Sequence, residues 1–229
     1  MHYSVSATIT FSALLAVAPT LATPICTSGN LAAFTSLTDG CSIDNLIFDN
    51  FRYFSVPVFG TPVAVPASEV SVTPIVEPGR PGLSFAGSWT VTNGSIDYLI
   101  FYEIRTASGE PTISNAYLDW SFSRNGFSVA SLDEFLCLGG TLTTGCMGTP
   151  AVHFHLRSSP VPSDPSDSVS FAPVSRVTVL KDVFVLGFPG SATISRADNQ
   201  WGQVPEPNSM LLICCGVVAL AVYRKARLS

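Results

Sequence analysis

Two histidines, His153 and His155, are separated by a single residue in the stretch HFH. If this stretch is a β-strand, both side chains point to the same side, because side chains alternate between the two faces of a strand. Two imidazoles on one face could bind one metal ion. The sequence does not fix a third ligand, although Asp119, Asp133 and Glu134 are available. A polar pair on a solvent-facing strand is the simpler interpretation, and we expect no metal or other cofactor.

Covalent catalysis finds little support in the sequence. There is no Gly-x-Ser-x-Gly motif, and the cysteines of the body are expected to be oxidised. A glycosidase needs two carboxylates flanking the scissile bond, and no spacing singles out such a pair. The glutamates available are Glu69, Glu77, Glu103, Glu110 and Glu134. We therefore predict a protein without enzymatic activity. The alternatives are a metal-dependent enzyme that uses the two histidines and a glycan-active enzyme that uses a carboxylate pair.

Four cysteines, Cys26, Cys41, Cys137 and Cys146, lie between the two apolar ends of the chain. An even number of cysteines in an exported protein predicts two disulfides, with three possible connectivities. Proximity in the sequence favours Cys26–Cys41 and Cys137–Cys146. A thiol metal site is disfavoured because no Cys-x-x-Cys spacing occurs.

The C-terminal tail has three parts in a fixed order. A Val204-Pro205-Glu206-Pro207 motif is followed by apolar or small residues from 210 to 223, and then by a basic cluster of Arg224, Lys225 and Arg227. As a helix, the apolar run would cover about 21 Å of a hydrocarbon core about 30 Å thick. It is therefore a marginal permanent anchor, and the basic cluster places the C-terminus in the cytoplasm.

The N-terminus predicts a cleaved signal peptide. An apolar run from Ile9 to Leu21 is followed by small residues, and cleavage is expected after Ala22. With a cleaved signal in front and a cytoplasmic tail behind, the body is expected to lie outside the inner membrane.

Together these features resemble the PEP-CTERM family of exported bacterial proteins. In that family the tail is recognised near its Pro-Glu-Pro motif by exosortase, a membrane-embedded processing enzyme, and the bacteria make exopolysaccharide. The resemblance implies signal peptidase and exosortase as partners, exopolysaccharide as a further partner, and transient anchoring in the inner membrane before delivery to the cell envelope, cell surface or exterior. The tail does not indicate what the body does. We expect a structural or interaction role for the body, with a carbohydrate-binding module as an alternative.

The charge of the chain excludes one class of partner. Between Thr23 and Glu206 there are sixteen acidic and eight basic side chains. A net charge of −8 over this region repels phosphate backbones, so we expect no nucleic-acid binding.

The elements that must position these residues are predicted to be short strands. Apolar runs rich in Val, Ile, Thr and Phe alternate with Pro, Gly, Asn and Asp, which is typical of an antiparallel β-sandwich, here expected to be jelly-roll-like. Asn93-Gly94 predicts a hairpin turn, and residues 29–37 predict one helical turn. Expected strands span residues 46–56, 69–76, 83–92, 96–106, 111–122, 126–132, 151–157, 175–187 and 191–197.

The chain therefore divides into four expected parts. These are a signal peptide (1–22), a β-sandwich body (23–198), a linker with the sorting motif (199–207) and a transmembrane sorting tail (208–229). Residues 158–168 are expected to form an exposed loop.

Overall fold

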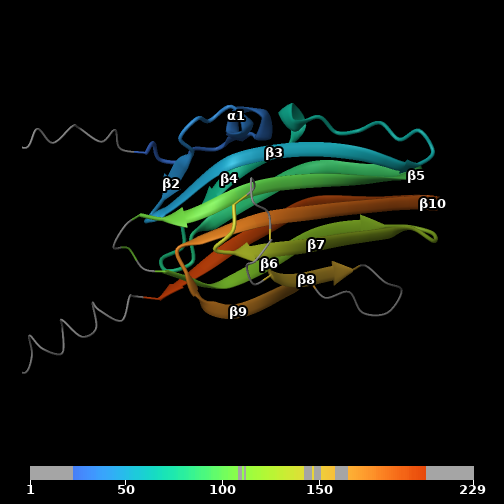
Figure 1. Ribbon diagram of the computed structural model, residues 1–229. Coiled ribbons are helices and arrows are strands. Elements are labelled where there is room, and N and C mark those ends of the chain that lie inside the picture. Colours follow the sequence, from blue (N-terminus) through green and yellow to red (C-terminus); the bar gives the residue numbers. More distant parts are fainter. Residues whose placement is uncertain are drawn as a thin grey trace, which may run out of the picture.

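The computed structural model describes residues 23–107, 110, 112–141, 146, 151–157 and 165–204. Within these residues ten strands form one antiparallel sheet, apart from a short parallel bridge between Ile25 and Ser42. The strands are β1 (Gly29–Asn30), β2 (Cys41–Ile43), β3 (Leu46–Phe59), β4 (Ser71–Ile75), β5 (Gly82–Thr106), β6 (Thr112–Arg124), β7 (Val129–Leu138), β8 (Ala151–Arg157), β9 (Ser166–Val174) and β10 (Arg176–Val204). A helix, α1 (Leu31–Thr35), and a 3-10 turn, η1 (Ala67–Glu69), lie near β3 (Figure 1).

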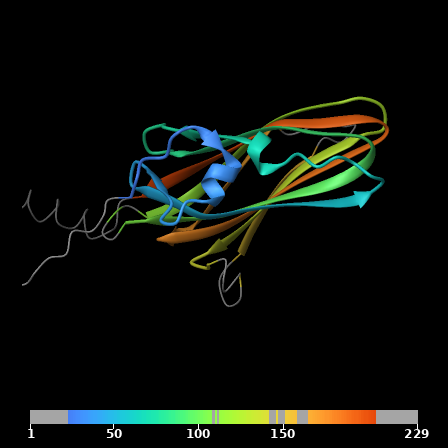
Figure 2. The ribbon, with the colours of Figure 1, turned by 90° about the horizontal axis from the view of Figure 1, so that it is seen from above.

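Two long strands, β5 and β10, run through the whole sheet and pair with each other along most of their length. The first half of β10 has β7 as its other neighbour, and the second half has β6. In the same way, β5 pairs with β4 near its start and with β3 near its end. The long ladder bends, so that its two halves lie in different layers (Figure 2). The result is a β-sandwich-like fold, as expected from the sequence.

We call the two layers A and B. Layer A contains β2, β3, the second half of β5, the first half of β10, β7 and β8. Layer B contains β1, β4, the first half of β5, the second half of β10, β6 and β9.

The bend depends on glycine. The β5–β10 register shifts between Gly187 and Ser191. A Cβ atom on Gly187 would lie 2.3 Å from the carbonyl oxygen of Val91, and Gly190 has a φ of 137°, which other residues rarely adopt. On the opposite strand Asn93 has a φ of 57°. The predicted hairpin at Asn93-Gly94 is therefore wrong: the turn residues bend β5, and the chain then continues along the same partner strand.

The core lies between the layers and is built by strand alternation. In β10, Val177, Val179, Val183 and Val185 are fully buried, while Leu180 faces the outside of layer A and is partly covered. Several large aromatic residues belong to this core. Trp89, Tyr98, Tyr102 and Trp201 are fully buried, Trp120 is nearly so, and Tyr117 is partly exposed.

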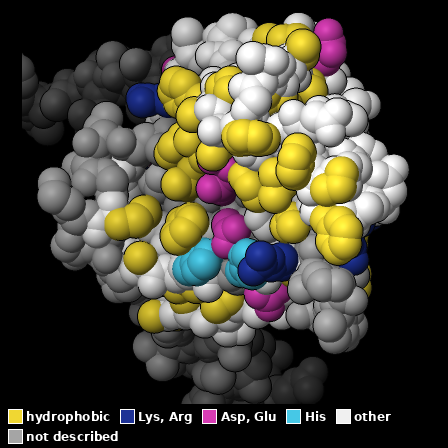
Figure 3. All heavy atoms as spheres, turned by 90° about the vertical axis from the view of Figure 1, so that its right-hand side faces the viewer, with side chains coloured by type: hydrophobic (Ala, Val, Ile, Leu, Met, Phe, Trp, Pro, Cys, Tyr) yellow, Lys and Arg dark blue, Asp and Glu magenta, His cyan; other side chains and the backbone are white. Residues whose placement is uncertain are grey.

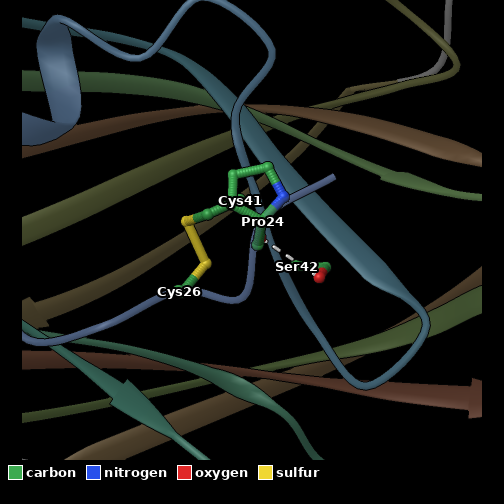
Figure 4. The surroundings of a disulfide bond; sticks show 4 residues. All are labelled: Pro24, Cys26, Cys41 and Ser42. Atoms are coloured by element: carbon green, nitrogen blue, oxygen red, sulfur yellow. Dashed lines mark hydrogen bonds between the residues drawn. A yellow bond between two sulfur atoms is a disulfide. The ribbon is translucent and has the colours of Figure 1, made fainter. Parts of the chain in front are cut away.

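Both disulfides have the connectivity that sequence proximity favours, Cys26–Cys41 and Cys137–Cys146. The first ties the N-terminal segment to β2 (Figure 4). Around it, the Cys26 amide donates to the Ser42 carbonyl oxygen at 2.9 Å, and the Ser42 amide donates to the Pro24 carbonyl oxygen at 2.7 Å. The predicted helical turn follows as α1, where the Asn30 side chain accepts a hydrogen bond from the Ala33 amide at 2.9 Å.

Two expectations about irregular segments are corrected by the sheet. Residues 199–204, expected to be linker, form the end of β10, because Asn199 and Trp201 alternate into the core and are fully buried. Residues 166–168, expected to be part of an exposed loop over 158–168, are strand, since β9 begins at Ser166 and pairs with β6; residues 158–164 lie outside the described residues.

Several predictions lie outside the described residues. They are the signal peptide (1–22), Pro205, Glu206 and Pro207 of the motif, and the tail with Arg224, Lys225 and Arg227. No helix in the described part of the chain is long and apolar enough to cross a membrane.

Candidate functional site

The two predicted metal-binding histidines meet a carboxylate on the outer face of layer A. Strand β8 pairs with β7, which places His155 opposite Asp133 and His153 opposite Phe135. His153 Nε2 lies 2.9 Å from Asp133 Oδ1, and His155 Nδ1 contacts the same oxygen. The possible ligand atoms of the three residues all lie within 4.8 Å of one another. Of the three available acidic residues, Asp133 is thus the one that joins the histidines.

This cluster is open to solvent and held from one side. The side chains of His153 and His155 are 47% and 42% exposed, and that of Asp133 is 21% exposed. The His153 ring stacks on Phe135, with ring centroids 4.2 Å apart and planes 7° from parallel. Figure 3 shows the two described histidines next to acidic and basic side chains, beside a broad hydrophobic area.

Further carboxylates face the same side of layer A. Asp182 of β10 lies directly opposite Asp133, and Asp97 of β5 lies opposite Phe184, two residues farther along β10. Burial raises the pKa of Asp182 to about 6, and the charges of Asp97 and Asp133 add to this effect. The outer face therefore carries a local excess of negative charge at the cluster.

Glu134, the next residue of β7, points the other way and is not available as a ligand. It is fully buried, and its Oε2 accepts a hydrogen bond from Lys181 Nζ at 2.5 Å. Its Oε1 accepts one from Asn199 Nδ2 at 2.6 Å. Burial raises the pKa of Glu134 and lowers the pKa of Lys181, and each partner's charge opposes the shift of the other. The Glu134 carboxylate is therefore part of the buried core and not of the surface cluster.

The other glutamates are dispersed. Glu103 accepts from Asn50 Nδ2 at 3.0 Å, Glu110 from Asn45 Nδ2 at 3.3 Å, and Glu77 from Gln200 Nε2 at 2.5 Å. Glu69 ends η1 on the surface. These separate surroundings give no support to the glycosidase alternative that the sequence left open.

A second candidate site is a groove of about 650 Å³ on the outer face of layer B. The Arg80 guanidinium lies over the Tyr117 ring, 3.9 Å from its centroid. Arg196 binds Asp119 at 3.0 Å and Asp198 at 3.4 Å. The lining residues come from four strands and one loop and are mostly polar: Ile75, Arg80, Tyr117, Leu118, Asp119, Ser166, Asp167, Ser168, Arg196, Asp198 and Gln200.

The groove follows from strand pairing that the sequence did not reveal. Gln200 lies opposite Tyr117, which lies opposite Ser168, and Asp198 lies opposite Asp119, which lies opposite Ser166. The groove was not predicted because its residues come from distant parts of the chain; Arg80 and Gln200, for example, are 120 positions apart. Among them, Asp119 was named from the sequence as an available metal ligand.

A hydrophobic area also lies on the outer face of layer A. Phe59 of β3 contacts Phe188 near the bend, with ring centroids 6.0 Å apart, and Phe54 contacts Phe101 at 5.9 Å. The side chains of Phe54, Phe59 and Phe188 are 51%, 56% and 56% exposed. Apolar side chains gathered this way are typical of surfaces that contact other molecules.

No protein-family model and no curated protein matches the chain. Three solved structures show a partial likeness, each with a TM-score of 0.30 or below. A glycosylation-associated protein complex from Streptococcus agalactiae is 12% identical, over 66% of this chain and 26% of that one. A carbohydrate-binding module, TmCBM61, in complex with β-1,4-galactotriose is 10% identical over 64% and 86%. The enzymatically active domain of a bacteriophage CBA120 tailspike protein is 12% identical over 68% and 19%. This chain thus spans about a quarter of the length of the first structure, and likenesses this low carry no inference about function.

Proposed function

We propose that the chain is an exported, exosortase-processed protein of the cell envelope or extracellular matrix, with a structural or interaction role and no catalytic activity. We also propose that the strands have the jelly-roll-like topology expected from the sequence. The observation that carries it is the continuity between β10 and the sorting motif. Strand β10 keeps its pairing with β6 as far as Val204, opposite Thr112, and the Pro-Glu-Pro triplet follows at once.

This continuity suits a processing signal. A cut after Val204 removes no residue of the described sheet, whereas a cut only four residues earlier would remove the buried Trp201. Pro205 and Pro207 have no amide hydrogen to donate to a strand ladder, and prolines favour the extended backbone that a protease cleft binds.

The disulfides support export, and the outer faces support interaction. Two disulfides are typical of a protein that folds in an oxidising compartment. The exposed Phe54, Phe59 and Phe188 and the polar groove offer two different surfaces to a partner.

Mass spectrometry of the protein from a bacterium with exosortase tests the processing step. We expect a C-terminus near 204–207 and no residue from the apolar run. A matched variant with Pro205, Glu206 and Pro207 replaced by alanine should keep its tail. A mature wild-type protein that ends at Ser229 would contradict the proposal.

A carbohydrate-binding role is the second candidate, and the layer B groove favours it. Its volume is in the range of small-ligand sites, and it combines carboxylates, an amide and hydroxyls around one aromatic ring. Electrophoresis through gels that contain exopolysaccharide tests this role. Retardation should be lost in Tyr117→Ala and kept in Phe188→Ala, which changes the other exposed surface. If Tyr117→Ala is retarded as strongly as Phe188→Ala, the groove is excluded as the binding surface.

A further inference from the structure

We propose that Asp133, His153 and His155 form a binding site for a zinc-type divalent cation, with one coordination position open to solvent. The site goes beyond the proposed export and interaction role, since it adds a specific ligand on the outer face of layer A. Three features of the structure lead to it: ligand geometry, local charge and access.

The geometry needs little change to hold an ion. Strand alternation puts both imidazoles on one face of β8, and the β7–β8 register brings the Asp133 carboxylate between them. With bonds to Zn²⁺ of about 2.0–2.1 Å, ligand atoms in a tetrahedral site lie about 3.3 Å apart. The three side chains already keep their ligand atoms within 4.8 Å, and His153 Nε2 is 2.9 Å from Asp133 Oδ1. Small side-chain rotations therefore suffice to close the site around an ion.

The ring of His153 is also held in place. It stacks nearly parallel on Phe135, which reduces the orientations it can adopt. A ligand fixed by its surroundings loses less entropy when it binds, so this contact favours binding.

The surrounding charge favours a cation. Asp182, directly opposite Asp133, has a buried carboxylate oxygen, Oδ1, with no hydrogen-bond partner among the described residues. Arg157, opposite Ser131 on β8, is the cation nearest in register to the histidines on this face. Asp97 and Asp182 outweigh this single positive charge, and Asp133 itself neutralises part of the charge of the ion.

The ligand set selects the kind of ion. Two imidazoles and one carboxylate suit Zn²⁺ and similar transition metals, whereas Ca²⁺ and Mg²⁺ prefer oxygen ligands. The half-exposed histidines let an ion enter from solvent. Because the protein supplies three ligands, the fourth tetrahedral position is left for water or for a donor from another molecule.

Isothermal titration calorimetry with zinc sulfate tests the site on the full, untagged chain after chelator treatment. Cys214 and Cys215 are replaced by serine in every sample, because free thiols also bind zinc. We expect saturable binding of about one equivalent. His153→Gln and His155→Gln should each weaken binding by at least about 10-fold, and Asp133→Asn should do the same. The control Arg157→Gln should bind as tightly as the parent or more tightly, since it removes a repelling charge.

Two further measurements separate an ion site from a hydrogen-bonded cluster. Calcium and magnesium chloride should give no comparable heat. Co²⁺ in place of zinc should give the strong visible absorption of a tetrahedral site, and added azide should change that spectrum by entering the open position. Zinc binding that is absent, or unchanged in correctly folded His155→Gln, would overturn the proposal and leave the three residues as a hydrogen-bonded surface cluster.

Discussion

Asp133 and Glu134 are neighbours on β7, yet their carboxylates have opposite surroundings. Asp133 faces solvent and contacts two half-exposed histidines, whereas Glu134 is fully buried with Lys181 and Asn199. The difference follows from the alternation of a strand, which sends successive side chains to opposite faces. The outward carboxylate can exchange its partners for a ligand from solution. The inward one cannot, because an unpaired buried charge is costly.

The largest expected effect comes from breaking the inner pair. Lys181→Met removes the partner of Glu134 and should lower the free energy of unfolding by about 3–5 kcal/mol, since a carboxylate is left buried without its counter-charge. Urea denaturation measures this loss. The double variant Lys181→Met/Glu134→Gln should recover at least half of it, because a neutral amide can still accept from Asn199. A single variant within about 1 kcal/mol of the parent would show that the buried pair contributes little to stability.

The next effect comes from the disulfide at the end of β7. Replacing Cys137 and Cys146 with alanine opens a short loop and should cost about 2–3 kcal/mol in the chain-entropy model. Thermal unfolding compares this variant with Lys181→Met, which should be the less stable of the two. If the order is reversed, the disulfide contributes more to the stability of the fold than the buried ion pair does.

A smaller effect is the pH dependence of the Lys181→Met variant. Burial already raises the pKa of Glu134 above its ordinary value of 4.5, and the substitution removes the charge and hydrogen bond that oppose this. The protonated acid is then favoured in the folded state, so stability should be higher at acid pH and fall as pH rises above about 4.5. Between pH 5 and pH 8 the difference from the parent should grow by about 1–2 kcal/mol. The double variant with Glu134→Gln serves as the control and should show no such trend.

The smallest effect is expected at the outer carboxylate. Without added metal, Asp133→Asn should change the free energy of unfolding by less than about 1 kcal/mol, because its partners are half exposed. Differential scanning fluorimetry with and without zinc sharpens the comparison. Zinc should raise the melting temperature of the parent and not of the variant. A large loss of stability in Asp133→Asn without zinc would mean that the outer cluster stabilises the fold, as the inner pair does.

Much of the fold could be predicted from local sequence. The apolar runs gave most strand positions, and proximity gave both disulfides, because these depend on neighbouring residues. The bend at Asn93-Gly94 could not be told from a hairpin, since the same backbone freedom serves both. What distinguishes the bend from a hairpin is β10, whose Gly187–Gly190 segment bends opposite Asn93-Gly94.

The candidate sites were predicted less completely. The His153–His155 spacing was visible in the sequence, but the choice of Asp133 over Glu134 depends on the face each takes on β7. Lys181 was equally ambiguous, since a lysine among valines gives no sign that a glutamate lies opposite it in the core. The layer B groove joins β6, β9 and β10 through pairings that no local pattern encodes.

The position of β10 has a mechanical consequence. Its last half lies between β5 and β6 and ends at Val204, directly before the tail. Hydrogen bonds in an antiparallel ladder run perpendicular to the strands, so a pull on the tail loads many of them at once, in shear, on both sides. They cannot open one after another as in a peeled hairpin. A body held by this strand should therefore resist extraction by force far better than one held by an edge strand.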